Sequence, residues 1–437
     1  MSQQIIKPSI LPGFMELLPK EQILFNQMKD TIRENYEKFG FLPIDTPVLE
    51  KSDVLLAKSA GETEKQVYRF EKGSTDMSMR FDLTVPLARY VSQHYSDLEF
   101  PFKRYQIGKV YRGERNQRGR FREFYQCDID IIGNGKLNVI NDAEIPAIIY
   151  STFKDLGFDS FTIKINNRKL LGGFFNSLDI EDITMVLRVI DKLEKIGIEK
   201  TKEELRLLEL NDETIDKILG FIEIKGTNDD IIDKLRELKI EDERFIEGLE
   251  ELATVKDYIK LFGVPDENFE IDLTIARGLD YYTGTVYETF LDDHKEIGSV
   301  CSGGRYDDLA SFYTKQKLPG VGISIGLTRL FFQLTEAKII EAEKTSLTEI
   351  LIIPMDGFLD EGVKLSNELR SMDIKTQVYI EKAKMGKMFN YADKLDIPYA
   401  IVIGEEEVKE KAYSFRDMKT GNQEKLSTSE IYSRLKE

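Results

Sequence analysis

The spacing of hydrophobic and polar residues changes several times along the chain, and each pattern predicts a different part of the fold. Residues 19–39 carry apolar side chains at helical spacing, begin with Pro19 and are followed by Gly40. A proline at the start and a glycine after the end are typical of an amphipathic helix, which we predict here. A short strand is expected at residues 41–45, because Pro47 would stop it.

Short strands separated by turn residues are expected over most of residues 67–132. Two of them, residues 102–112 and 121–132, are joined by a polar loop at 113–119, so they predict an antiparallel hairpin. Helical spacing returns at residues 141–156.

The middle of the chain, from about residue 167 to residue 263, is rich in Leu, Ile, Glu, Lys and Asp at helical spacing. We interpret it as a helical insertion with solvated charged faces and assign it no chemistry. Strands are expected again at 269–273 and 285–290, followed by glycine-rich turns through Gly304 and a last helix at 327–337.

The C-terminal segment alternates apolar strands, at residues 349–355, 375–380 and 399–403, with helices at 359–371 and 385–395. Such alternation predicts βαβ units around a small parallel or mixed sheet. The predicted fold is therefore α+β, with an antiparallel-sheet body and a C-terminal α/β domain. The predicted domains are a body of residues 1–166 and 264–337, an insertion at 167–263, a linker at 338–348 and a final domain at 349–437.

Composition narrows the classes of function. The chain has 437 residues, of which 41% are hydrophobic and 32% charged, as expected for a globular protein of more than one domain. Its net charge of −17 argues against a protein that coats nucleic acid nonspecifically, although a local basic site remains open. No apolar run is long enough to span a membrane, residues 1–9 have no apolar signal core, and the two cysteines, Cys127 and Cys301, form no paired motif. We expect a cytoplasmic protein without a disulfide framework or a zinc site.

The most informative segment is residues 111–130. It contains five arginines, whose forked donors suit phosphate and carboxylate oxygens: Arg112, Arg115, Arg118, Arg120 and Arg122. Charge count alone favours a solvated basic loop, but Gln126, Asp128 and Asp130 alternate with apolar residues and so share one face of a strand. A buried face with two carboxylates and an amide is costly unless it binds something polar.

Three glycine-containing segments carry similar chemistry. Residues 276–288 (ARGLDYYTGTVYE) combine glycines with an arginine and tyrosines, and residues 302–308 (SGGRYDD) repeat this in a predicted glycine-rich turn. Residues 320–329 (GVGISIGLTR) form a glycine-rich strand that leads into a helix, without the spacing of a dinucleotide or P-loop motif. Each is weak alone, since the first could be a packed turn and the last could relieve helix–sheet crowding.

Together these segments resemble the histidyl-tRNA synthetases, a family of class II aminoacyl-tRNA synthetases. Residues 111–126 (YRGERNQRGRFREFYQ) look like motif 2 in its histidyl form, and residues 277–282 and 302–307 resemble the two peptides peculiar to that family. Residues 320–329 resemble motif 3, the N-terminal helix and strand resemble motif 1, and the C-terminal segment looks like the family's anticodon-binding domain. The similarity extends over essentially the whole chain.

This resemblance implies that ATP activates L-histidine as histidyl-adenylate, which is then transferred to the 3′ end of histidine tRNA. It implies catalytic roles for Arg112 and Arg277, which would hold the α-phosphate and the substrate carboxylate, and for Arg329, which would hold the γ-phosphate. Glu114 and Arg122 would contact the nucleotide, and Mg²⁺ would bridge the outgoing phosphates. No nucleophile or general base from the protein is required.

The resemblance also implies a histidine pocket, in which the roles fall on Asp82, Thr84 and Gln126 for the amino group, Asp130 and Tyr282 for the imidazole nitrogens, and Tyr281 and Tyr306 for the walls. Gln117 and Arg120 would contact the tRNA, and the family is expected to form a homodimer through motif 1.

The sequence departs from the family pattern at several positions. Residues 80–84 read RFDLT where many bacterial members have RPEGT, Thr328 replaces the usual glutamate before the motif 3 arginine, and Asn116 stands where proline is common. The alternative to a synthetase is the histidine-sensing regulatory subunit of ATP phosphoribosyltransferase, which resembles the catalytic core only. The presence of Arg112, Arg277, Arg329 and the C-terminal segment favours the synthetase.

Overall fold

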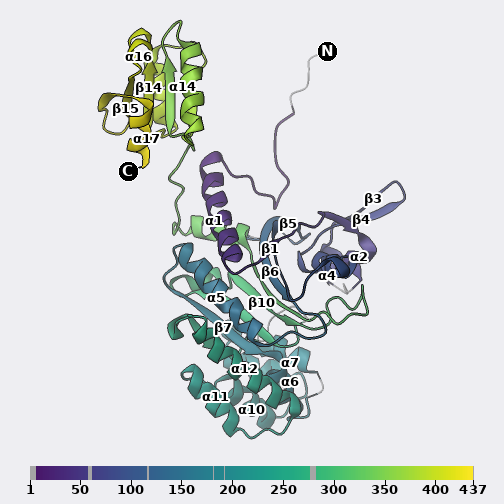
Figure 1. Cartoon of the computed structure of the whole chain (residues 1–437). Coiled ribbons are helices and arrows are strands. Elements are labelled where there is room, and N and C mark those ends of the chain that lie inside the picture. Colours follow the sequence, from purple (N-terminus) through teal and green to yellow (C-terminus); the bar gives the residue numbers. More distant parts are fainter. Residues whose placement is uncertain are drawn as a thin grey trace. The chain divides into compact units, whose positions relative to one another are not determined.

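The structure is a computed structural model that describes residues 6–57, 62–115, 118–180, 182–190, 192–275 and 282–436 (Figure 1). The chain divides into two compact units: a larger one of residues 1–15 and 28–339, and a smaller one of residues 16–27 and 340–437. Within the described residues no helix is both long and apolar enough to cross a bilayer.

The larger unit is built on an eight-stranded sheet in the order β1-β5-β6-β11-β10-β9-β7-β8. The edge pairs β1–β5 and β7–β8 are parallel and every pair between them is antiparallel. The strands are β1 (Leu42–Pro43), β5 (Phe102–Tyr111), β6 (Glu123–Ile132), β7 (Phe161–Asn167), β8 (Phe269–Ile271), β9 (Thr285–Leu291), β10 (Cys301–Tyr306) and β11 (Gly320–Ile325). The predicted antiparallel-sheet body is confirmed, and the predicted hairpin is β5–β6.

Two helices that flank the sheet match their predicted positions to within a residue or so. Helix α1 (Pro19–Lys38) ends just before Gly40, and the Tyr36 hydroxyl on its last turns donates to the carbonyl of Cys127 at 3.0 Å. Helix α5 (Ile140–Asp155) is buried along much of its length and packs against α12 (Glu243–Leu261) and β11. Burial of these faces against the sheet stabilises it, because apolar area is removed from water.

Residues 168–261 are largely helical, as the charged helical spacing predicts. The helices are α6 (Arg168–Asn176), α7 (Ile183–Ile190), α8 (Leu193–Ile196), α9 (Ile198–Arg206), α10 (Asp212–Ile222), α11 (Asn228–Glu237) and α12. Their starts are set by local chemistry: the Asn211 side chain accepts from the backbone of Thr214, and Thr227 and Asp230 form a capping box.

A small three-stranded sheet, in the order β2-β4-β3, contains β2 (Leu49–Lys51), β3 (Arg69–Lys72) and β4 (Thr75–Met79). Short helices α2 (Ser52–Leu56) and α3 (Glu62–Gln66) lie between β2 and β3 in the sequence. The prediction of strands over most of residues 67–132 is wrong for α4 (Thr84–Gln93). In α4 the residues Leu87, Ala88 and Val91 are buried at helical spacing, so packing against the rest of the unit stabilises a helix here.

The predicted glycine-rich turn at residues 302–308 is also corrected, because Cys301–Tyr306 form strand β10 in the middle of the sheet. Gly303 is required there by crowding, since a Cβ atom would lie 2.1 Å from the carbonyl oxygen of Gly322 on β11. The glycines therefore permit close strand packing and do not mark a turn. Short 3-10 helices occur at η1 (Tyr95–Asp97), η2 (Asp266–Asn268) and η3 (Asp292–Ile297), and the unit ends with α13 (Leu327–Glu336).

The smaller unit has a five-stranded mixed sheet in the order β13-β12-β14-β15-β16. Its strands are β12 (Ile350–Pro354), β13 (Thr376–Val378), β14 (Tyr399–Ile403), β15 (Tyr413–Asp417) and β16 (Gln423–Leu426), and its helices are α14 (Leu359–Ser371), α15 (Met385–Lys394), α16 (Glu405–Glu410) and α17 (Thr428–Lys436). The three parallel strands and two helices that the sequence predicts are confirmed. The antiparallel strands β15 and β16 were not predicted, and their polar, partly exposed residues explain why.

Candidate active site

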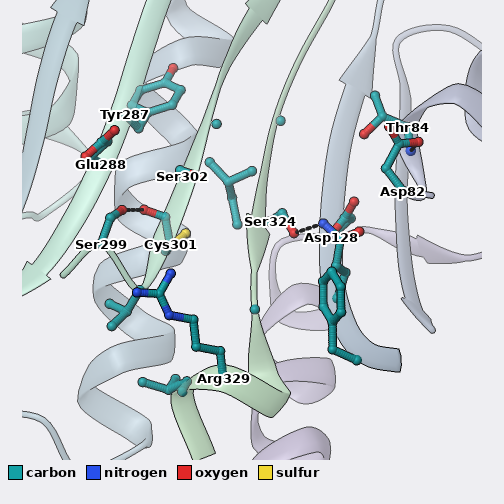
Figure 2. Close-up of a pocket in the computed structure, with 18 of the residues that line it drawn as sticks. Asp82, Thr84, Asp128, Tyr287, Glu288, Ser299, Cys301, Ser302, Ser324 and Arg329 are labelled. Carbon is teal, nitrogen blue, oxygen red and sulfur yellow. Dashed lines mark hydrogen bonds between the residues drawn. The ribbon is translucent and has the colours of Figure 1, made fainter. Parts of the chain in front are cut away.

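A cavity of about 470 Å³ opens on one face of the eight-stranded sheet, above β6, β11, β10 and β9. Polar residues reach it from several directions. Figure 2 shows Asp82, Thr84, Asp128 and Ser324 toward one side, and Glu288, Ser299, Cys301 and Arg329 toward the other.

The floor of the cavity is a strand face that the alternation in the sequence predicts. Gln126, Asp128 and Asp130 all line it from β6, and only 9%, 2% and 4% of their surfaces are exposed. Asp130 lies opposite Gly322 on β11, and Asp128 lies opposite Ser324. Since directly paired residues share a face, the sheet register places these groups side by side.

Glycines on β11 make room for the acids. A Cβ atom at Gly322 would lie 2.4 Å from an oxygen of Asp130, and one at Gly320 would lie 2.5 Å from the ring of Tyr306. The Tyr306 hydroxyl donates to Asp130 Oδ1 at 2.8 Å. Burial, followed by the negative charge of Asp130, raises the pKa of Tyr306 well above its usual value, so it stays a hydrogen-bond donor.

The acid at the end of this face is paired with a cation on the neighbouring strand. Arg104, on β5, is completely buried and forms an ion pair with Asp130, its partner in the sheet register. Burial raises the pKa of Asp130 above its ordinary value, while Arg104 and Tyr306 act in the opposite direction. A pair desolvated in this way is costly unless both charges remain matched.

Asp82 and Thr84 approach from the start of α4. Oδ1 of Asp82 accepts from the backbone N–H of Val85 at 2.9 Å and of Thr84 at 3.2 Å, so the first turn of the helix fixes this carboxyl. Burial raises the pKa of Asp82, partly opposed by these hydrogen bonds and by Arg112.

The opposite end of the cavity carries cationic side chains. The guanidinium of Arg112 lies 4.4 Å from the ring centre of Phe81 and 5.1 Å from that of Phe124, and its Nε donates to the carbonyl of Phe81 at 3.2 Å. Arg120 lies 3.3 Å from a carboxylate oxygen of Glu114. Stacking on aromatic faces fixes the plane of Arg112, which suits a planar, forked contact with an anion.

Arg329 follows the first residues of α13 and reaches the same cavity. Its Nη2 donates to the carbonyl of Ile297 at 3.1 Å. Burial of the guanidinium lowers its pKa below the usual value for arginine, and the nearby Arg120 lowers it further. Two arginines this close favour an anionic ligand between them.

Most of the site residues predicted from the sequence line this one cavity: Asp82, Thr84, Arg112, Glu114, Arg120, Gln126, Asp130, Tyr282, Tyr306 and Arg329. Arg122 does not line it. Its Nε donates to the carbonyl of Glu114 at 3.0 Å and its stem packs on Gly13. Arg277, Tyr281 and Gln117 lie outside the described residues.

Several cavity residues were not predicted. Ser324 lines the cavity from β11 and Glu288 lines it from β9, and both lie opposite Ser302 on the strand between them, β10. Arg104 on β5 forms the ion pair with Asp130. The signal for Ser324 was its alternation with Gly322 and Gly326, which places all three on one side of a strand. Cross-strand partners such as Arg104 become visible only when the register is known.

Comparisons with known proteins show which family the chain belongs to. A family model described as histidyl-tRNA synthetase matches residues 13–330, and one described as an anticodon binding domain matches residues 349–437. The chain is 65% identical over 437 residues to the histidine–tRNA ligase of Clostridium tetani, with both chains covered completely.

Solved structures show the same fold. The histidyl-tRNA synthetase of a Nostoc species matches with a TM-score of 0.92 and 42% identity, covering 99% of each chain. A structure from Bacillus halodurans described as an ATP phosphoribosyltransferase regulatory subunit/histidyl-tRNA synthetase matches with a TM-score of 0.74 and 21% identity, covering 88% of this chain and 97% of that one. The latter likeness concerns the fold alone.

The antiparallel sheet, the two-ended polar cavity and the separate α/β unit define a class II aminoacyl-tRNA synthetase with an anticodon-binding domain. Within that class, the chain belongs to the histidyl-tRNA synthetase family.

Proposed function

We propose that the cavity on the eight-stranded sheet carries out both steps of histidine–tRNA ligation, with the amino acid at its acidic end and ATP at its cationic end. The chain is an ATP-using ligase that charges tRNA with histidine, as its family membership establishes. The observation that supports the placement is the strand face of Gln126, Asp128 and Asp130 in the same cavity as Arg112.

At the acidic end, the α-amino group of histidine is held by Asp82, Thr84 and Gln126. The imidazole lies between Asp130 and Tyr282, with Tyr281 and Tyr306 as walls. The hydrogen bond from Tyr306 to Asp130 and the ion pair with Arg104 keep this carboxyl ready to accept a ring N–H. A pocket of buried hydrogen-bonding groups rejects side chains that cannot satisfy them.

At the cationic end, the histidine carboxylate attacks the α-phosphate of ATP and pyrophosphate leaves. Arg112 and Arg277 hold the carboxylate and the α-phosphate, and Arg329 holds the γ-phosphate, so negative charge developing on the phosphoryl oxygens meets fixed cations. Glu114 contacts the nucleotide, and Arg122, which does not line the cavity, acts through Glu114. The carbonyl contact of Arg122 Nε with Glu114 supports a role in shaping the loop that carries this acid.

Mg²⁺ would enter with ATP and would supply positive charge that offsets the charge of the outgoing phosphates. In the described part of the chain, no three His, Cys, Asp or Glu residues are grouped as a metal site. The described residues therefore do not form a metal cage, and we assign none of them to the ion.

For the second step, Gln117 and Arg120 contact the acceptor end of histidine tRNA, and residues 349–437 bind the anticodon. We further propose that the enzyme works as a homodimer in the cytoplasm. The free, buried cysteines Cys127 and Cys301 are consistent with a reducing compartment. Binding of tRNA should weaken with salt and with removal of residues 345–437.

The test is histidine-dependent ATP–pyrophosphate exchange, followed by charging of histidine tRNA. Exchange with histidine and none with other amino acids is expected. Histidine binding without exchange would favour the regulatory subunit of ATP phosphoribosyltransferase, a reading that the match of residues 349–437 to an anticodon binding domain makes less favourable. Arg277→Ala should abolish exchange and leave histidine affinity largely intact; normal activity in that variant would remove its assigned role.

A further inference from the structure

Two oxygen atoms on the cavity floor have no protein partner among the described residues. They are Oε1 of Gln126 and Oδ1 of Asp128, and both are buried. The two residues are separated by one position on β6, so their side chains leave the same face of the strand about 7 Å apart. Buried acceptors without a partner are costly, and here both line the cavity.

Ser324 on β11 fixes the direction of both groups. Nε2 of Gln126 donates to Ser324 Oγ at 2.8 Å, and the Ser324 hydroxyl is in turn a hydrogen-bond partner of the Asp128 carboxyl, which it faces in the sheet register. The amide therefore presents its oxygen to the cavity, and the carboxyl keeps one oxygen for a ligand. Figure 2 shows Ser324 between Asp128 and the opposite wall of the cavity.

The charge at this position favours a cation. Three acids, Asp82, Asp128 and Asp130, line the same part of the cavity, while Arg104 forms its ion pair with Asp130. Arg112, stacked on two phenylalanine rings beyond the end of β5, offsets part of the charge of Asp82, so the three acids still outnumber the two arginines. A compact ammonium with several N–H donors is the ligand that satisfies acceptors placed in this way.

Building on the proposed placement of histidine, we propose that Asp128 is a further substrate-binding residue, whose free carboxylate oxygen accepts a hydrogen bond from the α-ammonium group of the amino acid. Gln126 Oε1 accepts a second one, and Ser324 positions both. Asp128 thereby makes the site selective for an amino acid over the same side chain without its amino group.

The environment of Asp128 is consistent with this assignment. Burial raises its pKa to about 7, Arg104 and Ser324 lower it, and Asp130 and Asp82 raise it. An incoming ammonium group favours the ionised form, so it supplies the positive charge that the free site lacks at this acid.

The test compares two ligands on one variant. The Asp128→Asn side chain keeps the shape of the original one and still offers a hydrogen-bond partner to Ser324, but it carries no charge. The dissociation constant of L-histidine should rise about 10- to 100-fold, because a hydrogen bond to a charged group is lost. That of 3-(imidazol-4-yl)propionate, which has no amino group, should change by less than about threefold, and ATP affinity should be unchanged.

Two further variants keep the result interpretable. Glu123→Gln, on the same strand but paired with Lys109 at 2.8 Å outside the cavity, should bind both ligands like the unaltered protein. Ser324→Ala should weaken the binding of L-histidine by a smaller factor than Asp128→Asn does, and should leave the binding of the ligand without an amino group unchanged. Equal losses for both ligands would place Asp128 at the imidazole or in a purely structural role, and unchanged histidine affinity would also overturn the proposal. Exchange activity of the unaltered protein tests the proposed function separately.

Discussion

The two ends of the cavity are built in different ways. The acidic end consists of Gln126, Asp128 and Asp130 on a central strand, buried and held in register with β5 and β11. The cationic end consists of Arg112, Arg120 and Arg329. Arg112 directly follows strand β5, the exposed Arg120 lies in the loop after it, and Arg329 lies on helix α13.

This difference matches what each end has to do. A small amino acid is selected by fixed hydrogen bonds that exclude water, which a rigid sheet provides. A nucleotide and a tRNA end must enter and leave, which is easier where the contacts come from loops and long side chains. Changes at the two ends should therefore have separable effects on histidine and on ATP.

The largest expected effect is at the cationic end. Arg112→Ala should lower the rate of histidine-dependent exchange about 10³-fold, because a preorganised cation at the reacting phosphate is lost. Arg112→Lys should recover only part of it, since a lysine cannot make the forked contact. The matched control is Arg118→Ala in the same loop, whose side chain is 82% exposed and pairs with Glu336. An equal loss in both variants would show that the loop as a whole is responsible.

The next effect concerns the acidic end and separates binding from stability. Asp130→Asn should weaken histidine about 100-fold and cost about 3–5 kcal/mol of unfolding free energy, because Arg104 is left buried without its ion-pair partner. Adding Arg104→Met should restore most of the thermal stability but none of the histidine affinity. Calorimetry and thermal unfolding measure the two quantities, and joint recovery of both would contradict a direct role for Asp130.

These two ends also differ in how far they can be predicted from the sequence. The acidic end follows from alternation over five residues of β6, which the sequence alone displays. The partners that make it work, Arg104 and Ser324, come from strands whose register is set by packing of the whole sheet.

The residues of the cationic end were predicted from the resemblance to known motifs more than from the pattern of the sequence. One of these residues, Arg122, lies outside the cavity in the structure. Helix α4, which begins just after Asp82, was predicted as strand because it is short and lies among strands, and Cys301–Tyr306 was predicted as a turn because of its glycines. The secondary structure of short segments depends on how they are buried in the folded protein, and the local sequence pattern does not contain that information.

A smaller effect is expected on pH dependence. Asp128 has a pKa of about 7 in the free protein, so it is mostly protonated below that pH, and a cationic ligand that needs the ionised form must displace the proton. Histidine affinity should therefore rise with pH and level off above neutrality, by about tenfold between about pH 6 and about pH 8. The charged and titratable groups that interact with Asp128 include Arg104 on β5, Asp130 and Cys127 on β6, Cys301 on β10, Tyr36 on α1 and Asp82 before α4.

The comparison with Asp128→Asn isolates this contribution. Titration of the ligand imidazole and of the other acids affects both proteins, so the ratio of their dissociation constants should carry the Asp128 dependence. A ratio that does not change with pH would mean that Asp128 does not exchange a proton on binding.

The smallest effect is expected at the joint between the two ends. The Thr328 hydroxyl accepts from the backbone N–H of Tyr125 at 2.8 Å, and Thr328 is buried at the start of α13, one residue before Arg329. It thus connects β6, which carries the acids, to the helix that carries Arg329. Thr328→Val should cost about 1–2 kcal/mol and lower the exchange rate several-fold, because the N–H loses this acceptor and Arg329 is less well placed. Thr328→Ser keeps the hydroxyl and should restore the rate. If valine and serine behave alike, the hydrogen bond does not couple the two ends, and the cationic end is positioned by the loop alone.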